Sequence, residues 1–270
     1  MVSGGPPSFL AGSPPRIFAH RGLALNAPEN TVLAFRHALE HGATHLETDV
    51  RASRDGVAVL SHDASLALPE LDIPLEELRI AELQRIDLGY GQSFSSLTEA
   101  LEAFPEALFN LDVKSEGAIA ATAAAVLAAG ATGRVLVTSF SEERRRKTLR
   151  LLPGVASSAS APVVAQSVVA ARLGNRALLR RVLNGCVAVQ VPETASVLRV
   201  VTPHFVRAIH SAGVEVHVWT VNDPAAMERL LDTGVDGLVT DRPDLAAALV
   251  DRRSDRGTDR GTARDTPGMP

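Results

Sequence analysis

The feature of this sequence that most constrains its fold is a regular alternation of short apolar runs with longer helical patterns between residues 108 and 241. Strands that alternate with helices in this way form parallel β/α units. The predicted strands are Leu108–Lys114, Val135–Ser139, Val155–Ser157, Val187–Val191, Val214–Val221 and Gly237–Asp241. The predicted helices between them are Ile119–Ala129, Glu142–Leu151, about 163–183, Pro203–Ala212 and Pro224–Leu231.

The N-terminal part of the chain adds one more β/α unit. Arg16–Ala19 is a short apolar run that ends at polar residues, as a strand does where it leads into a loop. A helix is expected to follow, with Asn30 or Thr31 as its N-cap, because their side-chain oxygens can accept hydrogen bonds from the first turn. Gly42 is expected to terminate this helix.

A β-hairpin is predicted next. The run Leu46–Val50 leads to Asp55-Gly56 and returns as Val57–Ser61, and Asp-Gly between apolar runs is a strong hairpin signal. With both hairpin arms the chain has nine strand candidates, one more than an eight-stranded barrel needs. The length of 270 residues suits one (β/α)₈ TIM barrel of ~250 residues, so we predict this α/β fold with the surplus hairpin arm running antiparallel.

Composition suggests the domain boundaries. Residues 1–15 are rich in Gly, Pro and Ser and are predicted to form a flexible arm, followed by the barrel domain at 16–250. Within the barrel, 63–96 has a weak pattern and is interpreted as an insertion or lid. The segment 251–270 repeats Asp-Arg-Gly-Thr, has almost no apolar content, and is predicted to be a disordered tail.

Charge and targeting signals restrict the class of protein. The formal net charge is −4 with mixed signs, so no basic stripe indicates a nucleic-acid partner, and an anionic substrate would need a local cluster of cations. Cys186 is the single cysteine, which favours a reducing compartment. No secretory signal or membrane-spanning run is evident, so a soluble cytoplasmic protein is expected; the oligomeric state is not indicated.

Polar side chains occur where the predicted strands end. Barrel enzymes carry their chemistry at the C-terminal ends of the strands, so these residues are expected to meet in one site. They are His20, Arg21, Glu47, Asp49, Asp112, Lys114 and Trp219, joined by His62 through the hairpin.

These residue types suit the cleavage of a phosphodiester. Three acids on neighbouring strands repel one another unless a cation lies between them, and ligation by oxygen alone favours Mg²⁺ or Ca²⁺ over zinc. Two histidines can supply a general base and a general acid near neutral pH. Two basic side chains add positive charge that suits an oxyanion such as phosphate.

Each of these signals also has an ordinary structural explanation. Glu47 and Asp49 could form the exposed face of a strand, and Asp112 with Lys114 could be a cross-strand ion pair of little energetic value. Trp219 could be a core residue. His217 could face the barrel interior, but a packed histidine is the better interpretation. The functional interpretation is favoured because all the polar outliers fall at strand ends.

The motifs, in their order and spacing, resemble those of the glycerophosphodiester phosphodiesterase family. The resemblance covers residues 16 to about 248, nearly all of the chain expected to be ordered. The matching text is His20-Arg21-Gly22, Pro28-Glu29-Asn30-Thr31, Glu47-Thr48-Asp49-Val50, Asp55-Gly56, His62-Asp63, Asn110-Leu111-Asp112-Val113-Lys114, Val218-Trp219-Thr220-Val221-Asn222, Gly234-Val235-Asp236-Gly237 and Thr240-Asp241-Arg242-Pro243.

The resemblance implies a TIM-barrel hydrolase of lipid and glycerol metabolism that uses one divalent cation. It would cleave small glycerophosphodiesters, such as deacylated phospholipids, to glycerol 3-phosphate and an alcohol. The roles that it implies are His20 and His62 as the acid–base pair, Glu47, Asp49 and Asp112 as metal ligands, Arg21 and Lys114 as phosphate contacts, and Trp219 as a pocket wall. By similarity to phosphatidylinositol phospholipase C barrels, His20 is favoured as base and His62 as acid.

Two departures and two alternatives accompany this prediction. The family usually has Glu at the position of Asp112, so the metal is expected to be held through water or closer to that strand. The text after His62-Asp63 also differs, so the preferred alcohol does not carry over. One alternative is a related phospholipase D or C barrel that acts on intact lipid and expels a cyclic phosphate, although no apolar membrane-docking loop is evident in the sequence. The other is a barrel that binds a phosphorylated ligand without turnover.

Overall fold

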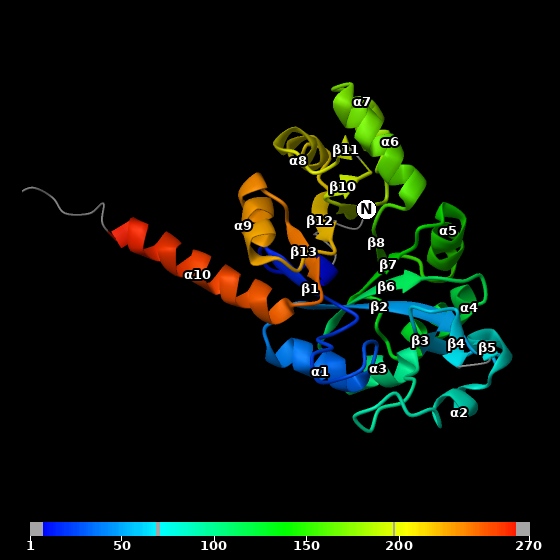
Figure 1. The fold of residues 1–270 in the computed structure, drawn as a ribbon. Helices are drawn as coiled ribbons and strands as arrows, with labels where there is room; N and C mark the ends of the chain where they lie inside the picture. Colours follow the sequence, from blue (N-terminus) through cyan, green and yellow to red (C-terminus); the bar gives the residue numbers. More distant parts are fainter. Residues whose placement is uncertain (1–7, 69–70, 197, 263–270) are drawn as a thin grey trace, which may run out of the picture.

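The computed structural model describes residues 8–68, 71–196 and 198–262. Eight parallel strands form a barrel, and the helices lie around its outside (Figure 1). The strands are β1 (Arg16–His20), β2 (His45–Ala52), β6 (Leu108–Val113), β7 (Val135–Thr138), β8 (Ala156–Ser157), β9 (Ala188–Pro192), β12 (Glu215–Trp219) and β13 (Gly237–Thr240). The predicted TIM barrel is thereby confirmed.

The sheet closes into a barrel where its two end strands, β8 and β9, meet. The strand order is β8-β7-β6-β2-β1-β13-β12-β9, with parallel pairing throughout. A parallel bridge between Ser158 and Ala188 joins the two ends of this order. Two backbone hydrogen bonds support the bridge, from Val187 N–H to the Ser157 carbonyl and from Ala159 N–H to the Ala188 carbonyl, both at 2.9 Å.

The predicted hairpin is present and supplies the ninth strand of the sheet. β3 (Ala58–Leu60) pairs antiparallel with β2, with Val50 opposite Leu60. Gly56 has a φ of 76°, a conformation that glycine adopts without steric cost, as the Asp-Gly turn requires. The Ser61 N–H donates to the Asp49 carbonyl (3.0 Å), so the returning arm brings residues 61 and 62 level with the end of β2.

The helices largely match the sequence prediction. They are α1 (Val32–Glu40), α3 (Leu97–Ala103), α4 (Ala118–Ala128), α5 (Glu142–Leu151), α6 (Ala161–Arg172), α7 (Arg176–Val182), α8 (Pro203–His210), α9 (Pro224–Thr233) and α10 (Pro243–Thr262). Thr31 caps α1 by accepting a hydrogen bond from the Ala34 N–H. The long helical region predicted at about 163–183 is two helices, because Gly174 takes a positive φ of 64° and Asn175 caps α7.

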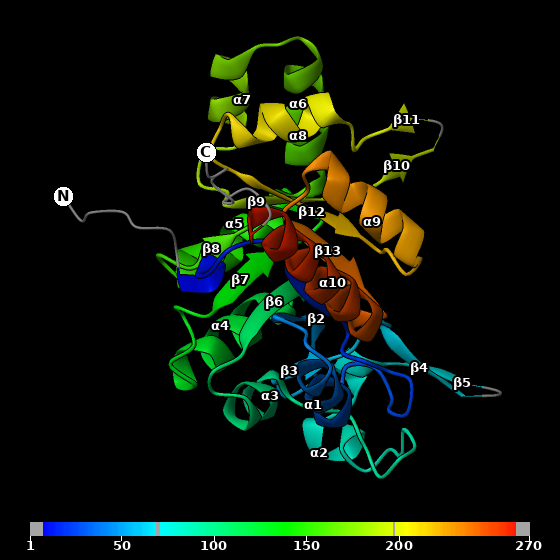
Figure 2. The same cartoon turned by 90° about the vertical axis from the view of Figure 1, so that its left-hand side faces the viewer.

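Part of the predicted N-terminal arm packs against the barrel. A short 3₁₀ helix, η1 (Ser8–Leu10), closes the end of the barrel opposite the carboxyl ends of the strands (Figure 2). Phe9 is fully buried against Phe18 and His45, and its carbonyl lies 3.1 Å from His45 Nε2. Arg16 also donates to the Leu10 carbonyl (2.8 Å). Phe9 and Leu10 of the predicted flexible arm are therefore packed against the barrel, whereas residues 11–14 are exposed. Residues 1–7 lie outside the described part.

The predicted insertion has more structure than its sequence pattern indicated. It contains an antiparallel hairpin of β4 (Ser65–Leu68) and β5 (Leu71–Pro74), then η2 (Leu75–Glu77) and α2 (Ile80–Leu83). An apolar cluster that includes Val59, Leu83 and Phe94 holds the segment against the β2–β3 hairpin. The segment therefore has its own small core.

The C-terminal tail also differs from the prediction. The last helix, α10, continues to Thr262, so residues 251–262 are helical where disorder was predicted, and residues 263–270 lie outside the described part. Leu249 is buried, and Arg253 pairs with Asp232 of α9 (2.7 Å). These contacts hold α10 against the barrel as far as Arg253, and its later turns project away from the barrel (Figure 1).

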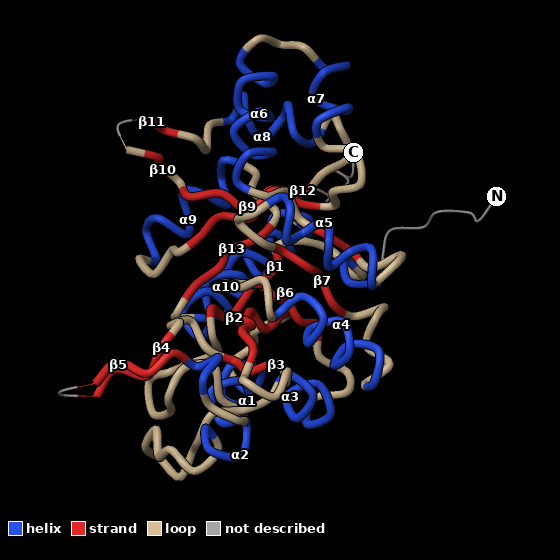
Figure 3. Tube along the Cα trace, turned by 90° about the vertical axis from the view of Figure 1, so that its right-hand side faces the viewer, coloured by secondary structure: helices blue, strands red, loops and turns tan. Residues whose placement is uncertain are grey.

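Two hairpins project from one end of the barrel. β4–β5 and the pair β10 (Thr194–Ala195) and β11 (Leu198–Arg199) extend on the side opposite η1, as the two side views agree (Figures 2 and 3). They flank the carboxyl ends of the barrel strands. Over the described ranges, no helix is both long enough and apolar enough to cross a lipid bilayer.

Candidate active site

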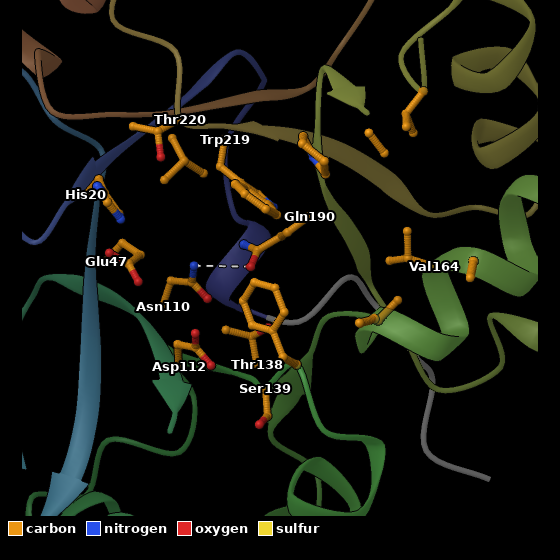
Figure 4. Close-up of a pocket in the computed structure, with 18 of the residues that line it drawn as sticks. His20, Glu47, Asn110, Asp112, Thr138, Ser139, Val164, Gln190, Trp219 and Thr220 are labelled. Carbon is orange, nitrogen blue, oxygen red and sulfur yellow. Dashed lines mark hydrogen bonds between the residues drawn. The ribbon is translucent and has the colours of Figure 1, made fainter. Parts of the chain in front are cut away.

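A cavity of about 670 Å³ lies at the carboxyl ends of the barrel strands. All eight residues that the sequence predicted for the site line it: His20, Arg21, Glu47, Asp49, His62, Asp112, Lys114 and Trp219. Figure 4 shows His20, Glu47 and Asp112 reaching into this space from neighbouring strands. None of the described residues of the 63–96 insertion lines the cavity, so the insertion does not act as a lid over it in this structure.

The acids and bases meet because β2 and β6 pair in register. Asp49 lies opposite Asp112, so their side chains point to the same face. Lys114 Nζ lies between them, 2.8 Å from Asp49 Oδ1 and 2.6 Å from Asp112 Oδ2. Arg21 Nε approaches Asp49 Oδ2 at 2.9 Å, an ion pair without the alignment of a hydrogen bond. This carboxylate–cation cluster is almost completely buried on its acidic side.

Glu47 is the acid of the cluster whose charge is least compensated. It is buried, and its Oε2 accepts a hydrogen bond from the Arg21 N–H (3.1 Å). Burial, followed by the negative charge of Asp49, raises the pKa of Glu47 to about 8 against the opposing effect of His20. At neutral pH this carboxyl group therefore holds a proton for most of the time, unless a positive charge arrives beside it.

The loop after β1 aims Arg21 at the cluster. Arg21 has a φ of 57°, unusual for a residue with a side chain and typical of strain at functional sites. The next residue has to be glycine, because a Cβ at Gly22 would lie 2.7 Å from Ala34 of α1. Arg21 Nη1 also donates to Glu29 (3.0 Å), so the guanidinium bridges the loop and the end of β2.

His20 is held by a partner that the sequence prediction did not include. Its Nδ1 lies 2.6 Å from Asp241 Oδ1 at the end of β13, and Asn222 Nδ2 donates to the other oxygen of Asp241 (2.6 Å). Burial opposes the charged imidazolium, but the hydrogen bond to Asp241 and the charge of Glu47 outweigh it and raise the pKa of His20. An acid directly after the last apolar strand was the available sequence signal for Asp241.

His62 lies at the mouth of the cavity on the hairpin. Its side chain is 44% exposed, and its Nδ1 is 2.9 Å from Asp63 Oδ1. Arg51 fixes the backbone at this point by donating to the His62 carbonyl from Nε (2.9 Å) and Nη2 (2.7 Å). The two predicted histidines thus differ in setting, since His20 is held at the cavity floor and His62 is at its rim.

The predicted metal site can be assessed from its donors. Among the described residues, no group of three His, Cys, Asp or Glu side chains is arranged as a site for a metal ion. Both oxygens of Asp49 are engaged by cations, yet Asp112 Oδ1 is buried without a hydrogen-bond partner. Together with the raised pKa of Glu47, this unpartnered oxygen fits a hard divalent cation in donor type.

Two amides that the sequence prediction missed lie deep in the cavity. Asn110 Nδ2 donates to Gln190 Oε1 (3.3 Å), a contact across the barrel that Figure 4 shows as a dashed line. Asn110 Oδ1 and Gln190 Nε2 are buried without partners. An acceptor and a donor are therefore both available to a hydroxyl-bearing ligand. Asn110 belongs to the matching text Asn110–Lys114 but was given no role, and no local motif marks Gln190, because β6 and β9 meet only through the closure of the barrel.

An aromatic pair borders the charged cluster. The rings of Trp219 and Phe140 are 5.9 Å apart and edge to face, and Lys114 Nζ lies 5.5 Å from the centroid of Phe140. Trp219 thus lines the cavity. Phe140 was not predicted, because it follows β7 in a loop whose sequence gives no functional signal.

Comparison with known proteins identifies this combination of fold and residues. The model of the glycerophosphoryl diester phosphodiesterase family matches residues 20–245. "Probable glycerophosphodiester phosphodiesterase 2" of Mycobacterium tuberculosis is 41% identical, over 91% of this chain and 95% of that protein.

Solved structures agree with the sequence match. A glycerophosphodiester phosphodiesterase from Agrobacterium tumefaciens has a TM-score of 0.71 and 26% identity, covering 87% of this chain and 99% of that one. A phosphodiesterase from Oleispira antarctica, solved with its product sn-glycerol-3-phosphate, has a TM-score of 0.70 and 26% identity over 88% and 97% of the two chains. The chain therefore belongs to the glycerophosphoryl diester phosphodiesterase family.

Proposed function

We propose that this protein hydrolyses glycerophosphodiesters to sn-glycerol 3-phosphate and an alcohol. The observation that carries the proposal is the convergence of His20 with the carboxylate–cation cluster of Glu47, Asp49, Asp112, Arg21 and Lys114 around one cavity. The names of the relatives support the substrate class, and the product held by the Oleispira antarctica protein supports the phosphate product.

The phosphate group is proposed to bind at Arg21 and Lys114. Both cations are already at the cavity wall, and each has an acid partner that fixes its position before substrate arrives. Pre-positioned cations stabilise charge that develops on phosphoryl oxygens without reorganising during the reaction. This arrangement favours binding of the anionic phosphodiester beside Arg21 and Lys114 rather than at the rim.

The two histidines are proposed to move the protons. Asp241 engages Nδ1 of His20, which leaves Nε2 to take a proton from the attacking oxygen as that oxygen bonds to phosphorus. The bond between phosphorus and the alcohol oxygen breaks, and His62 at the rim gives a proton to that oxygen. The net change is one water consumed for each diester cleaved.

A divalent cation, Mg²⁺ or Ca²⁺, is proposed to be held by Glu47, Asp49 and Asp112. Such an ion would act as a Lewis acid that offsets negative charge on the phosphoryl oxygens. Support comes from the unpartnered Asp112 Oδ1 and from the burial of Glu47 beside Asp49, because a bound cation would stabilise the ionised form of Glu47. Asp112 is one methylene shorter than the family's usual Glu, and its buried oxygen still reaches the cavity.

The test is a coupled assay for released glycerol 3-phosphate over a panel of glycerophosphodiesters, with and without EDTA. His20→Ala and His62→Ala should each lower kcat by about 10²–10⁴-fold, the usual contribution of one acid–base group. His41→Ala, at the exposed end of α1, is the matched control and should retain activity.

Two results would count against this proposal. Near-normal turnover of glycerophosphocholine in either cavity histidine variant would contradict the proton-transfer roles, and activity that survives EDTA would contradict the cation. Phosphorus NMR of the products adds a further distinction, because a persistent cyclic phosphate would indicate the phospholipase-type reaction instead.

A further inference from the structure

The helical hairpin of α6 and α7 carries apolar side chains on its outer surface. The two helices stand out from the barrel at the end of the molecule farthest from α2 (Figures 1 and 2). Of the nine exposed large apolar side chains in the described ranges, three are on this hairpin: Val169 (56% exposed), Leu173 (71%) and Leu178 (37%). Single exposed apolar residues are ordinary, but several that lie together indicate an interaction site.

These three side chains belong to one continuous surface. Leu173 lies one helical turn after Val169, because its N–H donates to the Val169 carbonyl (3.0 Å), so both are on the same side of α6. Val169 and Leu178 line an open groove of about 320 Å³ between the two helices. Val169 also lines the candidate active-site cavity, so this surface reaches the mouth of that cavity.

The same hairpin lies in the most basic part of the chain. Residues 144–192 contain nine Lys or Arg and no Asp or Glu, in a chain whose net charge is −4. On the hairpin itself, Arg172 and Arg176 flank the turn that carries Leu173. Arg181 lies one helical turn after Leu178 on α7. Basic and apolar side chains therefore alternate over one exposed area.

The three arginines are not neutralised within the protein. Arg172, Arg176 and Arg181 are exposed, and in the part of the chain that the structure describes none of them has a carboxylate partner. By contrast, Arg229 of α9 pairs with Glu193 (2.6 Å). The positive charge of the hairpin is therefore available to an anion outside the chain. We call the combination the α6–α7 surface and define it by Val169, Arg172, Leu173, Arg176, Leu178 and Arg181.

We propose that the α6–α7 surface docks on an anionic lipid bilayer, with its apolar side chains in the interface and its arginines at the lipid phosphates. Exposed apolar residues beside Lys or Arg are typical of helices that lie on a bilayer. An arginine stem packs along apolar surface while its guanidinium reaches a phosphate. No contact in the described chain fixes the three guanidiniums in position, which suits a fluid surface of phosphates better than a protein partner with fixed polar groups.

The inference is independent of the proposed function, because it concerns a surface outside the carboxylate–cation cluster. Its consequence is one of place. Since Val169 is shared by the groove and the cavity, docking holds the mouth of the candidate active site beside the bilayer.

The test is co-sedimentation of the full chain with lipid vesicles in the presence of EDTA. The protein should bind vesicles of equal parts phosphatidylcholine and phosphatidylglycerol, and binding should weaken as salt rises, because exposed charges are screened. Vesicles of phosphatidylcholine alone should bind about a hundredfold more weakly, since each of three arginines near an anionic surface contributes about fivefold. Absence of binding to the anionic vesicles would overturn the proposal.

An apolar variant locates the contact. Leu173→Asp should weaken binding to the anionic vesicles at least about tenfold, because it removes an apolar anchor and adds a charge that the lipid phosphates repel. Leu127→Asp is the matched control on α4, at 57% exposure, and should bind as the wild type does. If Leu173→Asp binds as tightly as its control, the α6–α7 surface is not the docking site.

A charge variant completes the test. The double change Arg176→Gln and Arg181→Gln should weaken vesicle binding about 25-fold. The same change at Arg36 of α1 and Arg85 just after α2, exposed positions on other elements, should have no effect. Binding of a duplex DNA probe without binding to vesicles would assign the basic surface to nucleic acid and overturn the bilayer proposal.

An activity measurement separates this inference from the proposed function. None of the α6–α7 variants changes the charged cluster, so all should hydrolyse glycerophosphocholine at the wild-type rate when vesicles are absent. If the wild type binds anionic vesicles but does not cleave glycerophosphocholine, the proposed function fails and the docking surface stands. If it cleaves the substrate but does not bind the vesicles, the docking inference fails alone.

Discussion

Lys114 offers the most direct test of the charge balance in the site. Its side chain is 19% exposed and bridges Asp49 and Asp112, whose carboxylates are almost fully buried. Lys114→Met keeps most of the aliphatic stem but removes the charge. The two acids then lose their shared partner, and removal of one member of a buried ion pair costs about 3–5 kcal/mol. For a domain of this size, at ~2 °C per kcal/mol, the expected loss is about 6–10 °C in Tm.

The assay is thermal unfolding followed by circular dichroism, in EDTA near pH 7.5. Lys147→Met is the matched control, because Lys147 also pairs with two acids, Glu116 and Glu143, but on the exposed face of α5. Exposed pairs contribute little, so this variant should unfold at nearly the wild-type temperature. Equal Tm values for the two variants would refute the interpretation that the buried carboxylates of Asp49 and Asp112 are stabilised by the charge of Lys114.

Cations and pH extend the same test. If the acids bind a divalent cation, added Mg²⁺ or Ca²⁺ should raise the Tm of the Lys114 variant more than that of the wild type. Burial raises the pKa of Asp112 while Lys114 opposes this rise. Without Lys114 the Asp112 carboxyl should take up a proton more readily. The difference in Tm between the wild type and the Lys114 variant should therefore become smaller as the pH falls.

Three further predictions concern single residues. Asp241→Asn should lower kcat/KM about ten- to a hundredfold, as expected for the loss of a charged hydrogen bond worth ~1.5–3 kcal/mol. It should also lower the pKa of His20, so the acidic limb of the pH–rate profile should move to lower pH. If the acidic limb does not move, Asp241 does not act through His20. The pKa of Glu47 is raised to about 8, so its proton has to leave before a cation binds. Calorimetry should therefore show that the affinity for Mg²⁺ or Ca²⁺ weakens up to about tenfold for each pH unit below about 8. Glu47→Gln should remove this pH dependence. Phe9→Ala should lower the free energy of unfolding in urea by about 3–5 kcal/mol, because Phe9 is fully buried; a loss well under 1 kcal/mol would show that η1 does not close the barrel in solution.

The parts of the fold that were predictable are those where local chemistry and tertiary packing agree. The Asp55-Gly56 turn and the alternation of Glu47 with Asp49 each determine a local geometry, and the barrel preserves it. The helix at Glu142–Leu151 begins and ends as predicted, because Ser141 caps it and Glu142 pairs within the helix with Arg145 and Arg146. In these cases the local sequence is enough to specify the local structure.

The parts that were not predictable depend on contacts between distant segments. Phe9 is ordered by His45 and Phe18, which only the folded barrel brings together. Asp241 follows the last strand, yet its role appears only when β13 pairs with β1 and places it beside His20. No local pattern contains these partners.

The site shows the same division. The eight residues were found because polar groups interrupt apolar strands, a signal that each strand carries on its own. Asn110 was missed because its partner Gln190 is on β9, across the barrel. The apolar cavity lining from α6 was missed because an apolar residue on a helix is normally assigned to the core, and the sequence does not show that Val164 and Val168 also line the cavity.

The narrow junction between β8 and β9 has a consequence for motion. β2 and β6 are joined by six residue pairs, whereas in the part of the chain that the structure describes β8 and β9 meet at a single bridge, Ser158 with Ala188. Local opening starts where the fewest hydrogen bonds have to break, so amide hydrogens at this seam should exchange with solvent before those of β2. The charged cluster is on β1, β2 and β6, away from the seam in the strand order, while α6 follows β8 directly. The barrel can therefore open locally at the β8–β9 seam, next to α6, while the charged cluster on β1, β2 and β6 keeps its geometry.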